Sequence, residues 1–353
     1  MRISGRKAVN IRAFFVIFAA MFLAAGCIKT VTPTAVVLKT EPATQAQLMQ
    51  EVNRFALVDS LHAKVDLKFE DNSYAELGMK EAFRNAPGEI AVQRPGKILL
   101  KIQVPAIHTD IAQMTSDGEK FRVAVLNVGS DKLRKFVVGT NMADYSKLEK
   151  VLSKEELENA KATKQSVSAF TRLRPQHFTD AMLVRPTDEA NLYTQSTIAQ
   201  IEKLSSDKSS TGTVLRGYYL LDEFVKHKDG SLMIARRFWF DRVGGIRLAR
   251  QQIFDTAGEI ESDILYGREG SLTDTGNYAN LPLKITVTRP KEKYAMSLTY
   301  QVPEAVTIGN KFPDTAFVLQ NTWNLEEVDL DKKLREVAGQ PMSDLKVNAL
   351  RDH

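Results

Sequence analysis

The chain has 353 residues, 48 Lys and Arg against 43 Asp and Glu, a formal net charge of +5, and one cysteine. One cysteine excludes a disulfide scaffold and a zinc ribbon, which need several, and 19 glycines exclude a collagen repeat. Hydrophobic residues make up 43% of the chain, enough to bury the core of one large domain or two smaller ones.

The N-terminal segment has the pattern of a secretory signal. Residues 1–12 contain no acidic residue and four basic ones, Arg2, Arg6, Lys7 and Arg12. Residues 13–26 are uncharged and mostly apolar, and this run is shorter than the about 20 residues of a membrane-spanning helix. We therefore expect residues 1–26 to be a signal peptide. Because its four charges account for most of the net charge, the basic composition does not indicate a nucleic-acid partner.

The sole cysteine follows this segment directly. Leu23-Ala24-Ala25-Gly26-Cys27 resembles the lipobox of bacterial lipoproteins, with Ala24 where leucine is commonest. The resemblance implies that the Cys27 thiol receives diacylglycerol and becomes the mature N-terminus, so that acyl chains hold the protein on a membrane. The non-acidic Ile28 implies sorting to the outer membrane. The alternative is a cytoplasmic protein with an apolar first helix and a buried cysteine.

Residues 27–43 contain prolines and no helical period, which indicates an extended tether. The following residues, 44–61, place apolar side chains near a 3.6-residue period and predict an amphipathic helix with Thr44 as its N-cap. The apolar positions of this helix are Leu48, Val52, Phe55, Leu57 and Leu61.

A different period begins in residues 63–70, where apolar and charged residues alternate strictly. This alternation predicts a strand with one buried face. Similar patterns predict further strands at 98–104, 121–125, 215–225, 234–241, 246–254, 259–266, 281–289 and 294–302. Turns are expected at Ser116-Asp117-Gly118, His227-Lys228-Asp229-Gly230, Thr256-Ala257-Gly258 and Gly244-Gly245.

Two helices are predicted between the strands, at residues 143–162 and at 175–184, where Pro175 suits a first helical turn. The Ser-rich residues 205–213 indicate a flexible loop, and residues 331–353 form a polar tail. The most economical assembly is an α+β, mainly β domain with one strongly curved antiparallel sheet of about ten strands, a half-barrel covered by a few helices. Those helices either fill the concave face or leave room for an apolar ligand.

An ordered set of short segments resembles the LolA/LolB-like outer-membrane lipoprotein carriers and receptors. The set comprises Val58-Asp59-Ser60-Leu61-His62-Ala63, Gly88, Arg94-Pro95, Pro105, Ser116-Asp117-Gly118, Phe121, Phe240-Asp241, residues 252–258 and residues 312–317. The resemblance spans about residues 45–325. It implies a half-closed antiparallel barrel with helices as a lid over an apolar cavity that carries acyl chains. Here the domain, residues 44–330, would be lipid-anchored and enlarged by a helical and loop insertion around residues 127–215.

The resemblance also implies a role for Arg94, which matches the position of an arginine that latches the lid shut in the soluble carriers. A guanidinium that reaches backbone carbonyls is a directional and breakable contact. The alternative is a surface arginine at a strand end before Pro95. The candidates for lining the cavity are Val65, Leu67, Leu100, Ile102, Met296 and Leu298; for each of them, ordinary core packing is the alternative.

No set of residues in the sequence predicts catalysis. Ser205 and Lys208 match a Ser-x-x-Lys pattern but lie in a polar loop without the companion Lys-Thr-Gly. His177 and Asp180 are three residues apart on a predicted helix and could be a base with its orienting group, although such a pair is usually a solvated helix face. The five histidines contain no i, i+4 pair, so we expect no metal, no cofactor and no enzyme activity.

These observations together favour an outer-membrane lipoprotein of a Gram-negative-type bacterium, facing the periplasm. Its expected partners are the membrane, through acylated Cys27, and the acyl chains of lipids or lipoproteins held in the apolar half-barrel. It would take part in lipoprotein localisation or in lipid transfer across the envelope. The alternative is a structural or assembly lipoprotein that uses the same curved sheet to grip an envelope protein and holds no ligand.

Overall fold

The computed structural model describes residues 35–71, 81–105, 109–126, 134–143, 174–203, 212–267, 281–301 and 303–338, together with residues 145, 148, 272 and 278. The signal segment, Cys27, most of the helix predicted at 143–162, most of the loop predicted at 205–213 and the end of the polar tail lie outside the described residues. Predictions for those segments stay predictions.

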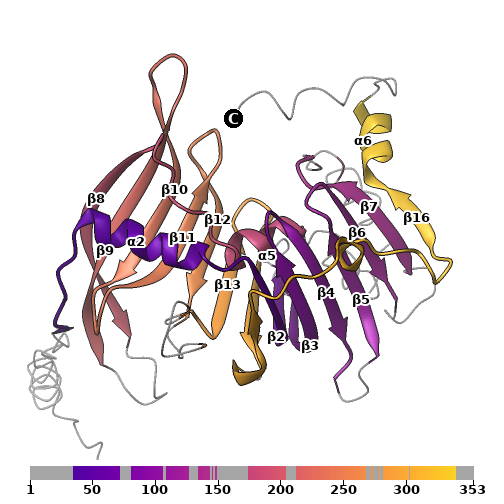
Figure 1. Ribbon diagram of the computed structural model, residues 1–353, viewed down its shortest axis with the longest axis horizontal. Coiled ribbons are helices and arrows are strands. Elements are labelled where there is room, and N and C mark those ends of the chain that lie inside the picture. Colours follow the sequence, from indigo (N-terminus) through magenta and orange to yellow (C-terminus); the bar gives the residue numbers. More distant parts are fainter. Residues whose placement is uncertain are drawn as a thin grey trace, which may run out of the picture. The chain divides into compact units, whose positions relative to one another are not determined.

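The described helices are α2 (Gln45–Ala56), α5 (Pro175–Met182) and α6 (Leu330–Ala338), with 3-10 turns η3 (Pro303–Ala305) and η4 (Asp314–Phe317). The strands are β1 (Val36–Val37), β2 (Ser60–Asp71), β3 (Glu81–Gln93), β4 (Lys97–Gln103), β5 (Asp110–Ser116), β6 (Lys120–Val125), β7 (Lys135–Thr140), β8 (Leu192–Lys203), β9 (Thr213–Lys226), β10 (Leu232–Asp241), β11 (Arg247–Phe254), β12 (Ile260–Tyr266), β13 (Lys284–Arg289), β14 (Tyr294–Tyr300), β15 (Thr307–Ile308) and β16 (Glu326–Asp329). Figure 1 labels these elements.

The chain divides into two compact units. The first comprises residues 1–37 and 201–215, and in its described part β1 pairs in parallel with β9, Val36 opposite Val214 and Val37 opposite Leu215. The second unit comprises residues 38–200 and 216–353. In the described ranges, no helix combines the length and the apolarity that crossing a membrane requires.

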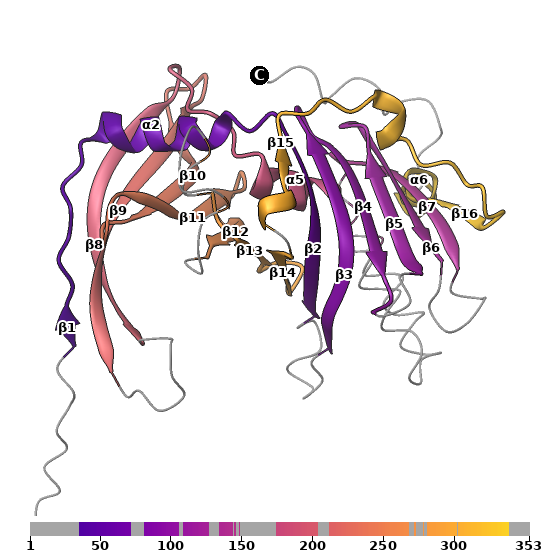
Figure 2. The same cartoon turned by 60° about the horizontal axis from the view of Figure 1, so that its bottom comes forward.

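The second unit is built on one large, curved and unclosed sheet (Figure 2). Over the described residues its strand order is β9-β10-β11-β12-β13-β14-β2-β3-β4-β5-β6-β7-β16, and β8 and β15 pair with β9 and β2. The pairings from β9 to β7 along this order are antiparallel, and β16 runs parallel to β7. The mainly β architecture is thus confirmed.

The sheet has more strands than the ten or so expected from the sequence, because β3, β5, β7, β8, β15 and β16 join it. Strand β3 contains Pro87 and Gly88, residues that the sequence alone associates with breaks in a strand. Strand β8 lacks a clear apolar alternation and leaves most of its side chains exposed.

Strand β2 lies between strands from the early and the late parts of the sequence. It pairs with β3 on one side and with β14 on the other, and Leu67 lies opposite Leu298 and Phe69 opposite Met296. These side chains are buried on the concave face, as the alternation predicted. The pairing places early and late apolar strands side by side in one core.

Two helices lie on the concave face. Helix α2 begins at the predicted N-cap: the backbone N–H of Gln47 donates to Thr44 Oγ1 at 3.4 Å, and the N–H of Thr44 donates to Gln47 Oε1 at 2.8 Å. The prediction that this helix extends to residue 61 was wrong. It ends at Ala56, Leu57 is 51% exposed, and Leu61 belongs to β2.

The second helix, α5, begins at Pro175 as predicted and ends two residues earlier than expected. Both helices contribute buried side chains to one apolar cluster with the concave face of the sheet. The predicted turns are present, and Gly230 of the β9–β10 turn has a φ of 87°, a conformation that favours glycine.

Candidate functional site

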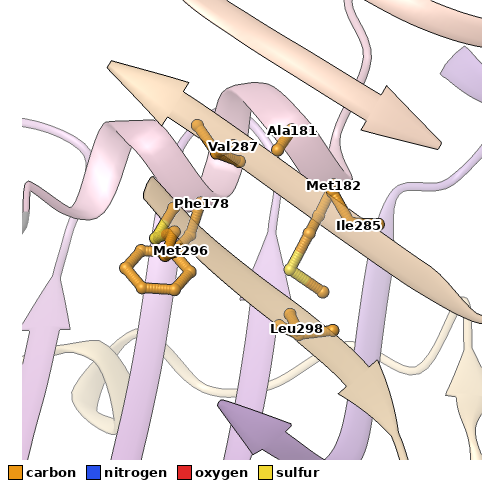
Figure 3. A pocket seen from close by; sticks show the side chains of 7 residues that line it. All are labelled: Phe178, Ala181, Met182, Ile285, Val287, Met296 and Leu298. Carbon is orange, nitrogen blue, oxygen red and sulfur yellow. The ribbon is translucent and has the colours of Figure 1, made fainter. Parts of the chain in front are cut away.

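Two small cavities lie where α5 meets the sheet, among the described residues. Figure 3 shows one of them, where α5 side chains face β13 and β14. It has a volume of about 10 Å³ and is lined by Phe178, Ala181, Met182, Ile285, Val287, Met296 and Leu298. A second cavity, of about 20 Å³, lies between α2, α5 and the sheet. A water molecule needs about 10–15 Å³ of such volume, so neither cavity holds an acyl chain in this state.

The six predicted lining residues divide between these cavities and the surrounding core. Met296 and Leu298 line the first cavity (Figure 3). The other four are buried in the same apolar cluster and line neither of the two cavities: Val65, Leu67, Leu100 and Ile102. Apolar side chains line both cavities, and neither admits an acyl chain unless α5 or α2 moves away.

Arg94 lies in the short connection between β3 and β4, and its guanidinium reaches the ends of both helical segments. Nε donates to the carbonyl of Val58 at 3.0 Å, just beyond α2. The two terminal nitrogens donate to the carbonyls of Leu183 at 3.4 Å and Val184 at 2.8 Å, just beyond α5. Arg94 is therefore not a free surface arginine, and its contacts are those that a latch between helices and sheet requires.

A second arginine, which the sequence analysis did not single out, binds the next two residues of the same segment. Arg236 on β10 is 4% exposed and donates to the carbonyls of Arg185 and Pro186, both at 2.8 Å. Its Nε donates to the carboxylate of Glu223 on β9, the residue opposite it in the sheet. The charge of Arg236 is thereby paired inside the protein.

The carbonyls after α5 need such partners because the last carbonyls of a helix have no partner within it. Residues 183–186 belong to neither a helix nor a strand. All four of their carbonyls are bound by Arg94 or Arg236, and the hydroxyl of Tyr266 donates to the carbonyl of Ala181 at 3.2 Å. We call residues 175–186 the α5 segment; polar side chains of the sheet hold its C-terminal end.

Glu223 is fixed by more than its arginine. Nδ2 of Asn191 donates to it at 2.7 Å and the hydroxyl of Tyr193 at 2.8 Å. Burial by itself raises the pKa of Glu223, but the hydrogen bond and charge of Arg236, with these two donors, hold that pKa below its ordinary value. The carboxylate is therefore ionised at neutral pH, as the pair with Arg236 requires.

The sequence carried a signal for this pair. Arg236 alternates in phase with Phe238 and Phe240, and Glu223 in phase with Tyr219 and Leu221, which are all buried. A charged residue in phase with an apolar strand face must be buried, and a buried charge needs a partner.

The prediction of a solvated helix face at His177 was wrong. His177 is 2% exposed, and the hydroxyl of Tyr294 on β14 is hydrogen-bonded to its Nδ1. Burial, with the positive charges of Arg289 and Arg174, lowers the pKa of His177 well below its ordinary value, so the imidazole is neutral. Within the described ranges, no group of three or more His, Cys, Asp or Glu side chains is placed to hold a metal ion.

The architecture is the one that the resemblance implies: a curved, unclosed antiparallel sheet with helices against its concave face and Arg94 bound to their ends. This is the mainly β, half-closed architecture that the sequence predicted. No protein-family model matches the chain, and no curated protein matches it.

Several solved structures are similar to the chain. A LolA superfamily protein from Nitrosomonas europaea is 12% identical, with a TM-score of 0.37 over 78% of this chain and 99% of that one. A DUF1329 family protein from Desulfovibrio piger is 10% identical, with a TM-score of 0.40 over 77% and 95%. A putative outer membrane lipoprotein-sorting protein domain from Vibrio parahaemolyticus is 8% identical, with a TM-score of 0.38 over 77% and 94%.

Proposed function

We propose that the protein is a lipid-anchored, non-enzymatic acyl-chain carrier or receptor of a Gram-negative-type cell envelope, held on the outer membrane and facing the periplasm. The observation that carries this proposal is the apolar cluster that the α5 segment covers, while the end of that segment is bound by breakable polar contacts from Arg94 and Arg236. The anchor is supported by the lipobox resemblance at Cys27 and the outer-membrane location by Ile28. Lipoprotein localisation or lipid transfer is the process that such a module would serve.

Binding would require the α5 segment to leave the sheet. The segment buries four large apolar side chains, Phe178, Met182, Leu183 and Val184, and exposing each costs about 1.5–3 kcal/mol. An acyl chain buried in their place contributes about 0.8 kcal/mol per CH₂ group, so a chain of about 15 such groups offsets roughly that cost. The free energy gained by burying the ligand is therefore similar to the free energy lost by exposing these four side chains. The ligand takes the place of the α5 side chains on the same strands.

The two arginines would set the balance between the closed and open states. A hydrogen bond from a charged group contributes about 1.5–3 kcal/mol, and each arginine makes two or more to helix ends. These hydrogen bonds can break and form again without any covalent change, and water can satisfy the freed groups once the segment has opened. In this proposal Arg94 and Arg236 latch the lid without touching the acyl chain.

The test is direct. The mature protein would be extracted in native form and examined by mass spectrometry for bound lipid, and the delipidated protein would be titrated with a fluorescent fatty acid. We expect co-purifying acyl lipid and saturable uptake. Arg94→Met should increase the rate of uptake, whereas Arg237→Met, which removes an arginine paired with Asp222 on the opposite face, should not. Absence of both bound lipid and uptake contradicts the proposal.

A second candidate function is a structural or assembly lipoprotein that grips an envelope protein without a ligand. It is favoured by the size of the two cavities described, about 10 and 20 Å³, neither of which has room for an acyl chain. Cross-linking in cells separates the two: a stoichiometric protein partner together with lipid-free protein supports the second candidate.

A further inference from the structure

The concave face beneath α5 is apolar over most of its length and polar at one end. Along β13 the inward side chains are Ile285, Val287 and then Arg289; along β14 they are Leu298, Met296 and then Tyr294. All six side chains are buried, and on both strands the order runs from apolar to polar. A strip of apolar residues thus ends at a row of polar ones.

The same row continues on β12. Asp263 lies opposite Thr288, so the next step of this antiparallel register places Ser262 opposite Arg289. Ser262 shares the face of Ile264, and Arg289 that of Val287, and both apolar residues belong to the core. Directly opposed side chains on one face have Cβ atoms about 4.5–5.5 Å apart, so the side chains of Ser262 and Arg289 start from neighbouring points on this face.

Polar atoms of this row are buried without a partner among the described residues. They are the hydroxyl of Ser262, which is 2% exposed, and Nε of Arg289, which is 5% exposed. Oε1 of Gln251, opposite Ile264 and thus two residues along β12 from Ser262, and Oε2 of Glu292, which pairs with Arg289, are also buried without a partner. Each unmade hydrogen bond of this kind costs about 1–3 kcal/mol. The two donors therefore lie at the end of the apolar strip, one inward position beyond Val287, which lines the first cavity.

The charges around the row decide which ligand suits it. The terminal NH2 of Arg289 already donates to Glu292 at 2.7 Å and to Glu261 at 3.2 Å, so this guanidinium is balanced by two carboxylates. A further negative charge would meet their repulsion. An uncharged carbonyl oxygen, by contrast, can accept from both free donors and adds no charge.

We propose that Ser262 and Arg289 bind the ester carbonyl of an acylglycerol whose chain lies along β13 and β14, with Gln251 accepting from a neighbouring glycerol hydroxyl. This inference rests on the proposed acyl-chain function and names its ligand class: esterified acyl chains in preference to free fatty acids. The apolar strip holds the chain, and the polar row sets its depth and direction.

The experiment compares two ligands with the same chain, 1-monopalmitoylglycerol and palmitate, in equilibrium dialysis against the delipidated mature protein at pH 7.5. We expect the glyceride to bind at least about tenfold more tightly than palmitate. Ser262→Ala should weaken glyceride binding about fivefold, the effect of one hydrogen bond, and leave palmitate binding unchanged. Ser262→Thr keeps a hydroxyl and should keep the preference.

Ser297→Ala is the matched control, because the Ser297 hydroxyl bonds Thr286 on the other face of β14 and β13. It should leave both affinities unchanged. Equal affinity of the unaltered protein for the two ligands, or an unchanged ratio in Ser262→Ala, overturns the ester site but leaves acyl-chain binding standing. Binding of neither ligand overturns the proposed function itself, and the inference with it.

Discussion

Arg94 and Arg236 bind consecutive pairs of carbonyls in one segment of chain: Arg94 takes those of Leu183 and Val184, and Arg236 those of Arg185 and Pro186. One arginine comes from the β3–β4 connection and the other from β10, and five strands separate β10 from β3 in the sheet. The α5 segment is therefore attached to distant parts of the same sheet. Releasing it requires both attachments to break.

The first prediction concerns the coupling between these two arginines. Arg94→Met should lower the free energy of unfolding by about 2–4 kcal/mol, and Arg236→Met by about 3–5 kcal/mol, because the latter leaves Glu223 buried and unpaired. Once either attachment is lost, the other holds a looser segment. The double variant should therefore lose about 1–3 kcal/mol less than the sum of the single losses, measured by urea unfolding.

Hydrogen exchange provides the local readout for the same variants. Amides of residues 176–188 should exchange faster in Arg94→Met, while those of β4 and β11 keep their protection. Arg237→Met, on the outer face, should change neither exchange nor coupling. Strict additivity of the two single losses would show that the arginines act on independent structures.

The second prediction concerns pH and His177. Its pKa in the folded protein lies well below that of the unfolded chain, about 6.5, owing to burial and to Arg289 and Arg174; its hydrogen-bond partner is Tyr294. Below pH 6.5 the unfolded state therefore binds more protons than the folded state, and stability falls as pH falls. The loss attributable to one such group is up to about 1.4 kcal/mol per pH unit, and above pH 6.5 it vanishes.

Urea unfolding between pH 5 and pH 8 measures this slope. In His177→Gln, which cannot titrate, the free energy of unfolding should fall less steeply from pH 6.5 to pH 5, by up to about 1.4 kcal/mol per pH unit. His227→Gln is the control, because His227 lies exposed in the β9–β10 turn and should leave the slope as it was. If His177→Gln and the unaltered protein decline equally, His177 is not the group responsible.

The third prediction tests a close approach between strands. A Cβ atom at Gly88 of β3 would lie 2.5 Å from the carbonyl oxygen of Lys101 in β4, which is backbone and cannot swing aside. Gly88→Ala should therefore lower the free energy of unfolding by about 1–3 kcal/mol, measured by urea unfolding. Gly96→Ala has its nearest contact at 3.9 Å and should change stability by less than about 0.5 kcal/mol. Equal effects of both changes would contradict this.

The fourth prediction concerns the anchor at Cys27. A serine hydroxyl cannot take the place of the thiol that the lipobox resemblance implies. Cys27→Ser should therefore remain uncleaved by the lipoprotein peptidase and unlabelled by radioactive palmitate. Ile28→Asp, which keeps the thiol, should still be labelled but should be retained at the inner membrane. Normal palmitate labelling of Cys27→Ser would rule out the lipobox interpretation.

Patterns over a few neighbouring residues predicted much of the fold. The alternation in β2 and β14, the N-cap at Thr44 and the turn at Gly230 are all present, because strand faces, helix caps and turns depend on residues close together in the chain. Patterns of this kind failed where a strand broke the local rules. Strand β3 keeps Pro87 and Gly88 in its interior because pairing with β2 and β4 on both sides outweighs their poor strand preference.

At the candidate site, too, the sequence indicated which residues matter but not what they contact. Arg94 was singled out through its place in an ordered set of segments, but its three carbonyl partners lie 36 to 90 residues away. Arg236 was missed, although its phase with Phe238 indicated burial, because its carbonyl partners come from a segment about 50 residues earlier. Which carbonyls an arginine reaches depends on how the sheet curves.

The sequence by itself determined that this chain builds one-sided strands and amphipathic helices, and it predicts an acylated N-terminus at Cys27. Only the tertiary structure decided that α5 packs against β13 and β14, that two arginines bind residues 183–186, and that Ser262 and Arg289 share one face at the end of the apolar strip. The physical reason is that local periodicity records which face of an element is buried, whereas the partner of a buried group is set by the register of strands far apart in the chain.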